Sequence, residues 1–234
     1  MSINKRQSQC VILLHGLART HLSMRRMERY LKTSGYCVFN ISYPSRYLPI
    51  DELAPLAINQ GLEQCNQNGI NKVHFVTHSM GGILVRQYLH HHKIPNLGRV
   101  VMLGPPNHGS EAADRLKHLP GYRLINGPAG FQLGTHKTDI PKTLGPVDFD
   151  LGVIAGKRSN NLFLSALLPG EDDGKVTVES TKIEGMTDFI TLPISHTFMM
   201  QDYETLFQTN YFLDHGYFDH ERIQHAITDN LDGT

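Results

Sequence analysis

The residues that could do chemistry in this chain are a serine, a group of acids and a histidine. Ser79 stands in Thr77-His-Ser-Met-Gly81, Glu171-Asp-Asp173 comes next, and His196 follows in Ile194-Ser-His-Thr197. A serine hydroxyl becomes a nucleophile when a neutral imidazole takes its proton and a carboxylate fixes the imidazole tautomer. These residue types predict acyl transfer from an ester through a covalent acyl-enzyme.

The acid of this trio is chosen by the turn that follows it. Asp173 immediately precedes Gly174, whose conformational freedom suits a sharp turn into Val176. This turn favours Asp173 over its neighbours, and Asp172 stays open as the alternative.

Ser79 lies where an apolar run, Val73-His-Phe-Val76, leads directly into a helical pattern that starts at Met80. A tight strand-to-helix turn lifts a serine hydroxyl above the edge of a sheet and aims the N-terminus of the helix at it. The positions two before and two after the serine should be small. Gly81 meets this requirement and Thr77 departs from it, so an ordinary serine N-cap is the competing interpretation.

A second motif, His15-Gly-Leu17, follows the first apolar run of the chain. Gly16 lets the chain turn so that the N–H of Leu17 can face Ser79. The N–H groups of Leu17 and Met80 would then form an oxyanion hole. His15 is better explained as a structural hydrogen-bonding residue than as an acid or base.

These residues need a scaffold that brings distant parts of the chain together. Short runs that are apolar on both faces predict buried parallel strands, and longer segments with helical spacing lie between them. The predicted strands are 11–14, 36–41, 73–76, 99–103, 151–155 and 189–192, and the predicted helices are 23–33, 49–67, 80–91 and 206–213. This alternation predicts an α/β fold in one domain, 1–234, whose site lies at the carboxyl ends of the strands.

Residues 111–148 interrupt the alternation, because nine glycines and prolines fall between Glu111 and Pro146. A long connection inside a compact domain is often functional, so we expect a lid or a wall of the substrate site. The alternative is a poorly ordered surface excursion.

The chain carries 22 Lys and Arg and 22 Asp and Glu, and its formal net charge is zero. This balance gives no electrostatic footprint for nucleic acid or an anionic membrane. No run approaches the roughly 20 apolar residues of a membrane span, and no signal peptide is visible. We therefore expect a cytoplasmic protein without nucleic-acid partners, a monomer or weak dimer that acts on a small-molecule or lipid acyl ester.

Cys10, Cys37 and Cys65 are odd in number and show no CxxC pairing, which favours three reduced thiols over a disulfide or a zinc site. The run His90-His-His92 places adjacent side chains in different directions, so it predicts a solvated helix end rather than a metal site. No metal or cofactor is expected.

Taken together, the motifs resemble the α/β-hydrolase superfamily, and most closely its small bacterial lipase and esterase branch. The matching residues are His15-Gly-Leu17, Thr77-His-Ser-Met-Gly-Gly82, Gly104-Pro-Pro-Asn-His-Gly-Ser110, Asp172-Asp-Gly-Lys-Val176 and Ser195-His196. The resemblance implies Ser79, Asp173 and His196 as the catalytic residues and Leu17 and Met80 as oxyanion donors. The further substrate contacts that we expect are His15, Gly16, His78, Pro105 and Asn107.

The chain also departs from the full family pattern. Only ten residues precede the first predicted strand, so a mostly parallel core of about six strands is expected. The segment from Leu162 to Leu168 is apolar and fits either an acyl pocket or core packing. His108 competes with His196 as the base, but it precedes the acid, against the chain order of this fold. A thioesterase, an acyltransferase or a non-catalytic binding module with the same fold remain alternatives to the esterase.

Overall fold

The computed structural model describes residues 6, 8–159, 168 and 170–224. Its centre is one sheet of six strands in the order β2-β1-β3-β4-β5-β6, and every neighbouring pair is parallel. The strands are β1 (Gln9–Leu14), β2 (Cys37–Ile41), β3 (Lys72–His78), β4 (Leu97–Leu103), β5 (Leu151–Gly156) and β6 (Asp188–Leu192).

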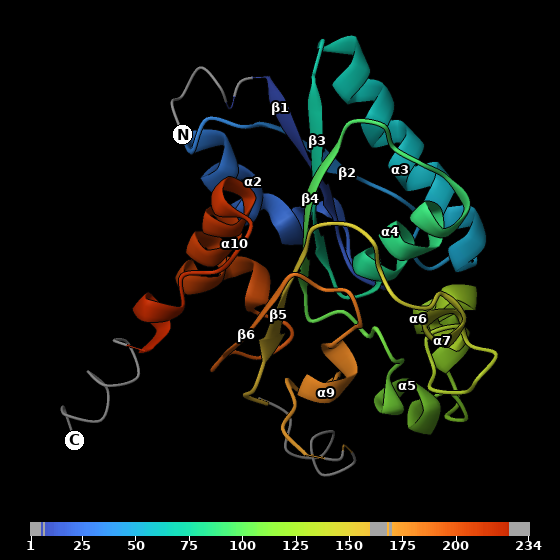
Figure 1. The fold of residues 1–234 in the computed structure, drawn as a ribbon. Helices are drawn as coiled ribbons and strands as arrows, with labels where there is room; N and C mark the ends of the chain where they lie inside the picture. The colour runs from blue at the N-terminus through green and yellow to red at the C-terminus, as the bar shows by residue number, and fades with distance from the viewer. Residues whose placement is uncertain (1–5, 7, 160–167, 169, 225–234) are drawn as a thin grey trace.

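Helices cover both faces of this sheet (Figure 1). On one face lie α2 (Arg25–Thr33) and α10 (Tyr203–His215), and on the other lie α3 (Ile50–Gln67) and α4 (Met80–His91). Shorter helices sit near the carboxyl ends of the strands or between these elements: η1 (His21–Met24), α5 (Glu111–Leu116), α6 (Tyr122–Phe131), α7 (Ile140–Thr143), α9 (Val178–Thr181) and η2 (Met199–Gln201).

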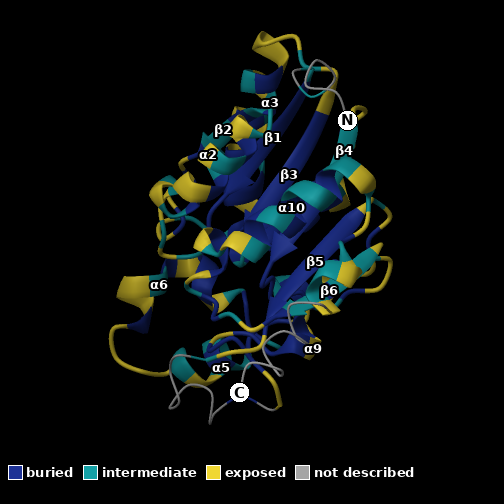
Figure 2. Cartoon of the chain, turned by 90° about the vertical axis from the view of Figure 1, so that its left-hand side faces the viewer, coloured by how far each residue is buried: buried dark blue, intermediate teal, exposed yellow. Residues whose placement is uncertain are grey.

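Both faces of the central strands are buried, as the dark colour of β1, β3 and β5 in Figure 2 shows. Alternate side chains of a strand point to opposite faces. In β1, Cys10, Ile12 and Leu14 therefore pack with the α3 and α4 side, while Val11 and Leu13 pack with the α2 and α10 side. This two-sided burial explains why β1 is a continuous apolar run.

The prediction of a mostly parallel, six-stranded sheet flanked by helices is confirmed. The last long helix is longer than expected because its ends carry good caps. The Asp202 carboxylate accepts a hydrogen bond from the N–H of Thr205 at the start, and Gly216 takes φ 85° at the end.

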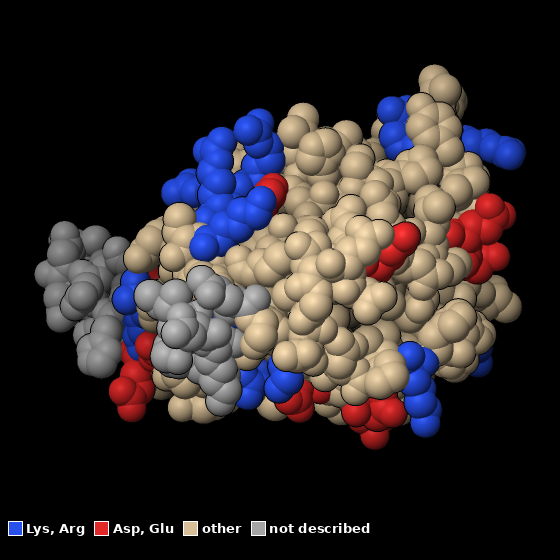
Figure 3. Space-filling view, turned by 90° about the horizontal axis from the view of Figure 1, so that it is seen from above, with Lys and Arg blue, Asp and Glu red and all other residues tan. Residues whose placement is uncertain are grey.

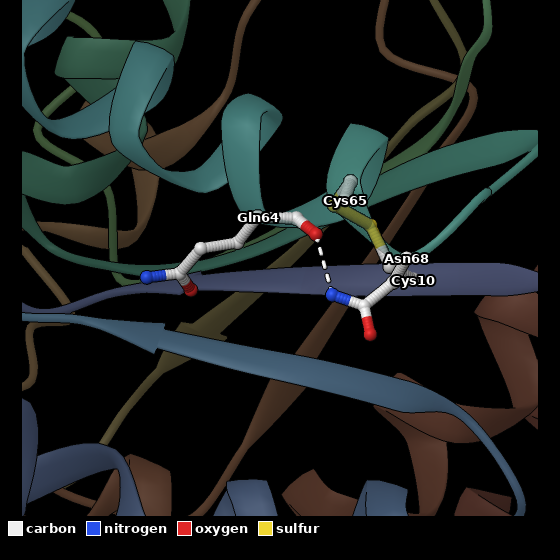
Figure 4. The surroundings of a disulfide bond; sticks show 4 residues. All are labelled: Cys10, Gln64, Cys65 and Asn68. Atoms are coloured by element: carbon white, nitrogen blue, oxygen red, sulfur yellow. Dashed lines mark hydrogen bonds between the residues drawn. A yellow bond between two sulfur atoms is a disulfide. The ribbon is translucent and has the colours of Figure 1, made fainter.

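The prediction of three reduced thiols is wrong. Cys10 in β1 and Cys65 in the last turn of α3 form a disulfide, and both residues are buried (Figure 4). They are 55 residues apart, and α3 brings them together by packing on β1. A rule that looks for closely spaced cysteines misses such a pair. Cys37 keeps a free thiol.

The breaker-rich segment folds into three short helices, α5, α6 and α7. The Ser110 side chain caps α5 by accepting from the N–H of Ala113. A kink in α6 falls at Gly127, where φ is 61° and a Cβ would lie 1.7 Å from the carbonyl oxygen of Arg46. Glycine is therefore required where this segment crosses the loop after β2.

Among the described residues, no helix has the length and apolar character that would let it cross a bilayer.

Candidate active site

Ser79 occupies a strained turn between β3 and α4. Its backbone has φ 53° and ψ −123°, a region that residues with a side chain rarely adopt. The turn is held by the Ser79 N–H, which donates to the carbonyl of Leu103 in β4 at 2.8 Å. Gly81 permits the tight passage, because a Cβ there would lie 2.7 Å from the carbonyl oxygen of Leu14. The strain and these contacts hold the half-buried serine at the strand end.

Thr77, the departure from the expected motif, is fully buried. Its hydroxyl donates to the carbonyl of Val101 at 3.5 Å, so the extra atoms of threonine are accommodated between β3 and β4. The turn at Ser79 therefore forms despite a β-branched residue two positions earlier.

His196 and Asp173 come from loops that follow β6 and β5. The His196 Nδ1 and the Asp173 Oδ2 are 2.7 Å apart, and both side chains are almost completely buried. The other oxygen, Oδ1, accepts from the N–H groups of Lys175 and Val176 at 3.0 and 2.9 Å. An ionised carboxylate in this position fixes the imidazole so that Nδ1 carries the proton and Nε2 is free to act as a base.

The neighbouring acid, Asp172, has a different surrounding. Its Oδ1 accepts from the N–H of Gly174 at 2.6 Å, which closes the local turn. The geometry thus brings Asp173, and not Asp172, to His196.

Gly104, at the end of β4, makes room for the buried acid and base. Its φ is +54°, and a Cβ there would lie 3.0 Å from the Asp173 Oδ2 and 3.1 Å from the His196 Nδ1. The sequence alone does not explain why position 104 must be glycine, because the neighbours that require it are distant in the chain.

His78 joins the serine turn to the loop of the base. Its Nε2 lies 3.0 Å from the carbonyl oxygen of His196, and the two rings have centroids 4.7 Å apart. Burial, and then the nearby His196, hold the pKa of His78 well below its usual value. His78 is therefore a neutral side chain that donates to the His196 backbone.

The loop after β1 passes close to Ser79. A Cβ on Gly16 would lie 3.1 Å from the Ser79 Cβ, so the backbone of this loop faces the serine directly. Ala18 has φ 53°. Among the described residues, Ala18 and Ser79 are the two residues other than glycine that have a positive φ. The amides of Leu17 and Met80 therefore belong to two strained turns that meet beside the serine.

Tyr43, for which no sequence motif indicates a role, supports this loop. Its hydroxyl donates to the carbonyl of His15, and its ring stacks on the His15 ring with centroids 4.0 Å apart. Burial lowers the pKa of His15 to about 4, so the ring is neutral. This surrounding is that of a structural histidine.

A cavity of about 310 Å³ opens beside Ser79 and His196. Its wall includes apolar side chains from α5, α6 and the segment between α6 and α7, among them Leu116, Ile125 and Leu133. Two of the expected substrate contacts, Gly16 and His78, line it.

The remaining expected contacts, His15, Pro105 and Asn107, do not line this cavity. Asn107 is fully buried and structural: its side chain donates to the carbonyl of Thr181 at 2.7 Å, and its carbonyl accepts from the Arg86 guanidinium at 2.9 Å. Pro105 lies against α4, 3.3 Å from where a Cβ on Gly82 would be.

The two other histidine features lie away from the cavity wall. His108 is exposed, and its N–H donates to the carbonyl of Ser180. His90 and His91 end α4, where their rings contact each other edge to face. Over the ranges that the structure describes, no group of three or more His, Cys, Asp or Glu side chains could hold a metal ion. Of the apolar segment 162–168, residues 162–167 lie outside the described residues.

Comparisons with known proteins agree with this fold. The family model described as "Alpha/beta hydrolase family" matches residues 11–183. The fold is similar to that of the mature Bacillus licheniformis lipase BlEst2, with a TM-score of 0.68, 21% identity, and 87% of this chain and 90% of that chain covered. It is also similar to Staphylococcus hyicus lipase (TM-score 0.62, 12% identity, 97% and 96% covered).

A third similar structure is the phospholipase PlaB from Legionella pneumophila (TM-score 0.64, 20% identity, 80% of this chain covered), of which this chain spans about half, 53%. No curated protein matches the chain. The family model covers more than half of the sequence, and the parallel sheet and the turn at Ser79 agree with it. The chain therefore belongs to the alpha/beta hydrolase family.

Proposed function

We propose that this protein is a serine hydrolase that cleaves carboxylic esters through Ser79, His196 and Asp173. The observation that carries the proposal is the 2.7 Å contact between the His196 Nδ1 and the Asp173 Oδ2, beside a cavity that Ser79 and His196 both line. Three residue types with complementary roles meet at strand ends, and a merely structural arrangement has no need of a serine that lines a cavity from a strained turn.

In the first half of the reaction, the Ser79 Oγ attacks the carbonyl carbon of the ester while the His196 Nε2 takes its proton. The carbonyl oxygen becomes an oxyanion, and the N–H groups of Leu17 and Met80 donate to it. As the tetrahedral intermediate collapses, the bond to the alcohol oxygen breaks and His196 returns its proton to the leaving alcohol.

In the second half, a water molecule gives a proton to His196 and its oxygen attacks the acyl carbon. Collapse of this intermediate releases the acid and restores the Ser79 hydroxyl. The Asp173 carboxylate stays ionised throughout and stabilises the imidazolium.

We propose residues 111–148 as a wall of the substrate site. The cavity is lined on this side by Ala112, Ala113, Leu116, Ile125 and Leu133, which favour an apolar acyl group. Ile125 of α6 lines the cavity and is 57% exposed, and its neighbour Leu124 is 79% exposed.

A fluorophosphonate probe tests the nucleophile directly, because it reacts with an activated serine. Wild type should be labelled at Ser79 and should hydrolyse 4-nitrophenyl butyrate, and Ser79→Ala should lose both. Ser23→Ala is the matched control, since this hydroxyl donates to the carbonyl of Thr20 and Ser23 does not line the cavity. If the wild-type protein is not labelled by the probe and cleaves no acyl ester, the proposal is refuted. A non-catalytic binding module with this fold would then explain the result better.

The same wild type with acyl-thioesters and with an added acceptor alcohol separates an esterase from a thioesterase and an acyltransferase. Faster turnover of the thioester, or transfer to the alcohol instead of water, would replace the ester hydrolase proposal while keeping the three residues.

Three reduced thiols would indicate the cytoplasm. The Cys10–Cys65 disulfide instead favours an oxidising compartment. Mass spectrometry of the protein isolated under alkylating, non-reducing conditions tests this point. Alkylation of all three cysteines would restore the cytoplasmic assignment, whereas alkylation of Cys37 alone supports oxidation. We keep the expectation of a monomer or weak dimer, which sedimentation analysis tests.

A further inference from the structure

The wall of the cavity beside Ser79 carries an uncompensated positive charge. Arg19 and Lys175 both line it, and none of its described lining residues is Asp or Glu. Neither side chain forms an ion pair with a described residue. By contrast, the face at the amino ends of the strands shows Lys and Arg together with Asp and Glu (Figure 3). The described lining of the cavity therefore holds two cations and no carboxylate to balance them.

The loop that faces Ser79 also positions Arg19. Its N–H donates to the carbonyl of Gly16 at 3.3 Å, and its carbonyl accepts from the Ser45 hydroxyl at 3.4 Å. Arg19 therefore closes the turn that contains Leu17 and the strained Ala18. A guanidinium at this point lies next to the backbone that would hold the oxyanion.

Lys175 is positioned by the loop that supplies the acid. Its N–H donates to the Asp173 Oδ1 at 3.0 Å, and its carbonyl accepts from the Ser110 hydroxyl at 3.0 Å. Lys175 lines the cavity and keeps part of its surface exposed to solvent, so a ligand in the cavity can reach it. Both backbone bonds survive a substitution, which makes Lys175 suitable for testing.

The positive charge of Arg19 disfavours a second positive charge on Lys175. The pKa of Lys175 is lowered, first by desolvation and then by the charge of Arg19, while Asp173 raises it in part. Asp173 offers little more, because its oxygens already bind His196, Lys175 N–H and Val176 N–H. An anionic group on the substrate would relieve this repulsion.

We propose that Arg19 and Lys175 form a subsite for an anionic group, and that the preferred substrate is an acyl ester with a phosphate or carboxylate close to the scissile bond. This inference rests on the proposed ester hydrolase function and names its substrate class. In this arrangement the apolar side chains of α5 and α6 take the acyl chain, and Arg19 and Lys175 take the charged group.

The test compares two soluble esters that differ in one group. Wild type should cleave 1-butyrylglycerol 3-phosphate with a kcat/KM about tenfold above that of 1-butyrylglycerol at low ionic strength, because two charge-assisted contacts each contribute a few-fold. The ratio should fall as salt is added. In the double variant Arg19→Gln, Lys175→Gln the ratio should fall to about one.

The matched control is the double variant Arg25→Gln, Arg26→Gln, which removes two exposed cations of α2 that do not line the cavity. It should keep the wild-type ratio. A wild-type ratio near one, or a ratio that survives loss of Arg19 and Lys175, overturns the subsite.

Vesicles distinguish a lipid headgroup from a soluble phosphate ester. If phosphatidylglycerol is preferred over phosphatidylcholine and the soluble phosphate ester is also preferred, the subsite is supported and accepts a headgroup. If the preference occurs with vesicles alone, surface cations attract the membrane and the cavity subsite is refuted.

A binding measurement keeps the subsite testable apart from catalysis. The ether 1-O-butylglycerol 3-phosphate has no scissile ester, and calorimetry should detect its binding to wild type and not to the Arg19→Gln, Lys175→Gln variant. If wild type hydrolyses no ester but binds the ether, and the double variant does not bind it, the ester hydrolase is refuted and the subsite is supported. Equal binding to both proteins, or to neither, refutes the subsite.

Discussion

The two ends of the central sheet are built on different principles. At the carboxyl ends, Ser79 and Ala18 are strained and Gly104 has a positive φ, and His196 and Asp173 are buried polar groups. Near the amino end of β1, the Cys10–Cys65 disulfide ties the strand to α3. Strained backbone and buried polar groups lower the stability of the fold at the carboxyl ends, whereas the disulfide near the amino end raises it. Substitutions should therefore affect activity at one end and stability at the other.

The largest expected effect is at the acid. Asp173→Asn should lower kcat for 4-nitrophenyl butyrate by about 10⁴-fold, because the amide favours the wrong imidazole tautomer. The matched control is Asp172→Asn, whose side-chain oxygen can still accept from the N–H of Gly174, with an expected loss below about tenfold. Equal losses in the two variants would contradict the assignment of Asp173.

The disulfide should carry the next largest effect, and on stability alone. A closed loop of 55 residues predicts that Cys10→Ala, Cys65→Ala lowers the free energy of unfolding by roughly 4 kcal/mol. Urea unfolding measures this, and labelling of Ser79 by the fluorophosphonate at 25 °C should be unchanged. Cys37→Ala, which leaves the disulfide intact, is the control. A reversed outcome, with labelling lost and stability kept, would break the contrast between the two ends.

Gly104 sharpens the comparison, because a single methyl group should disturb the acid and the base. Gly104→Ala places a Cβ 3.0 Å from the Asp173 Oδ2, and kcat should fall about 100-fold as the pair is displaced. Gly121→Ala is the control for backbone strain, since Gly121 has φ 85° with no atom within 4 Å of its Cβ. It should lose stability without losing kcat. If both variants keep full activity, crowding at the pair is irrelevant.

Buried neutral histidines occur at both ends, so acid should weaken both. Burial lowers the pKa of His15 to about 4 and that of His74 to about 3 from the ordinary 6.5. Below pH 6.5 these histidines are protonated in the unfolded chain but stay neutral in the folded chain. The free energy of unfolding is therefore highest above pH 6.5 and decreases as the pH falls toward the pKa of the folded state. Each histidine should lower the free energy of unfolding by about 2 kcal/mol at pH 5 relative to pH 7.

Urea unfolding at pH 7 and pH 5 checks this slope in wild type and in His74→Asn. His74 contacts the Gln9 side chain and accepts from the N–H of Arg99, so the variant is less stable at pH 7. Its loss between pH 7 and pH 5 should nevertheless be about 2 kcal/mol smaller than in wild type. An unchanged difference would show that His74 is not a source of the acid sensitivity.

Much of the fold was predictable because its signals are local. The apolar runs for β1, β3, β4 and β5 and the helical spacing of α3 and α4 each lie within a few consecutive residues. The position of Ser79 at a strand-to-helix turn was also predictable, since the strand, the turn and the helix are contiguous in the sequence. The lone deviation, Thr77, proved compatible with the turn because its side chain packs between β3 and β4.

By itself, the sequence determined the α/β class, the order of the strands and helices along the chain, and the candidate residues Ser79, Asp173 and His196. Only the tertiary structure decided that Asp173 rather than Asp172 contacts His196, that Gly104 must leave space for them, and that Cys10 meets Cys65. It also brought Arg19 and Lys175 to the lining of one cavity. The physical reason is that these relations join residues far apart in the chain, and packing of the sheet and its helices, rather than local periodicity, sets their distances.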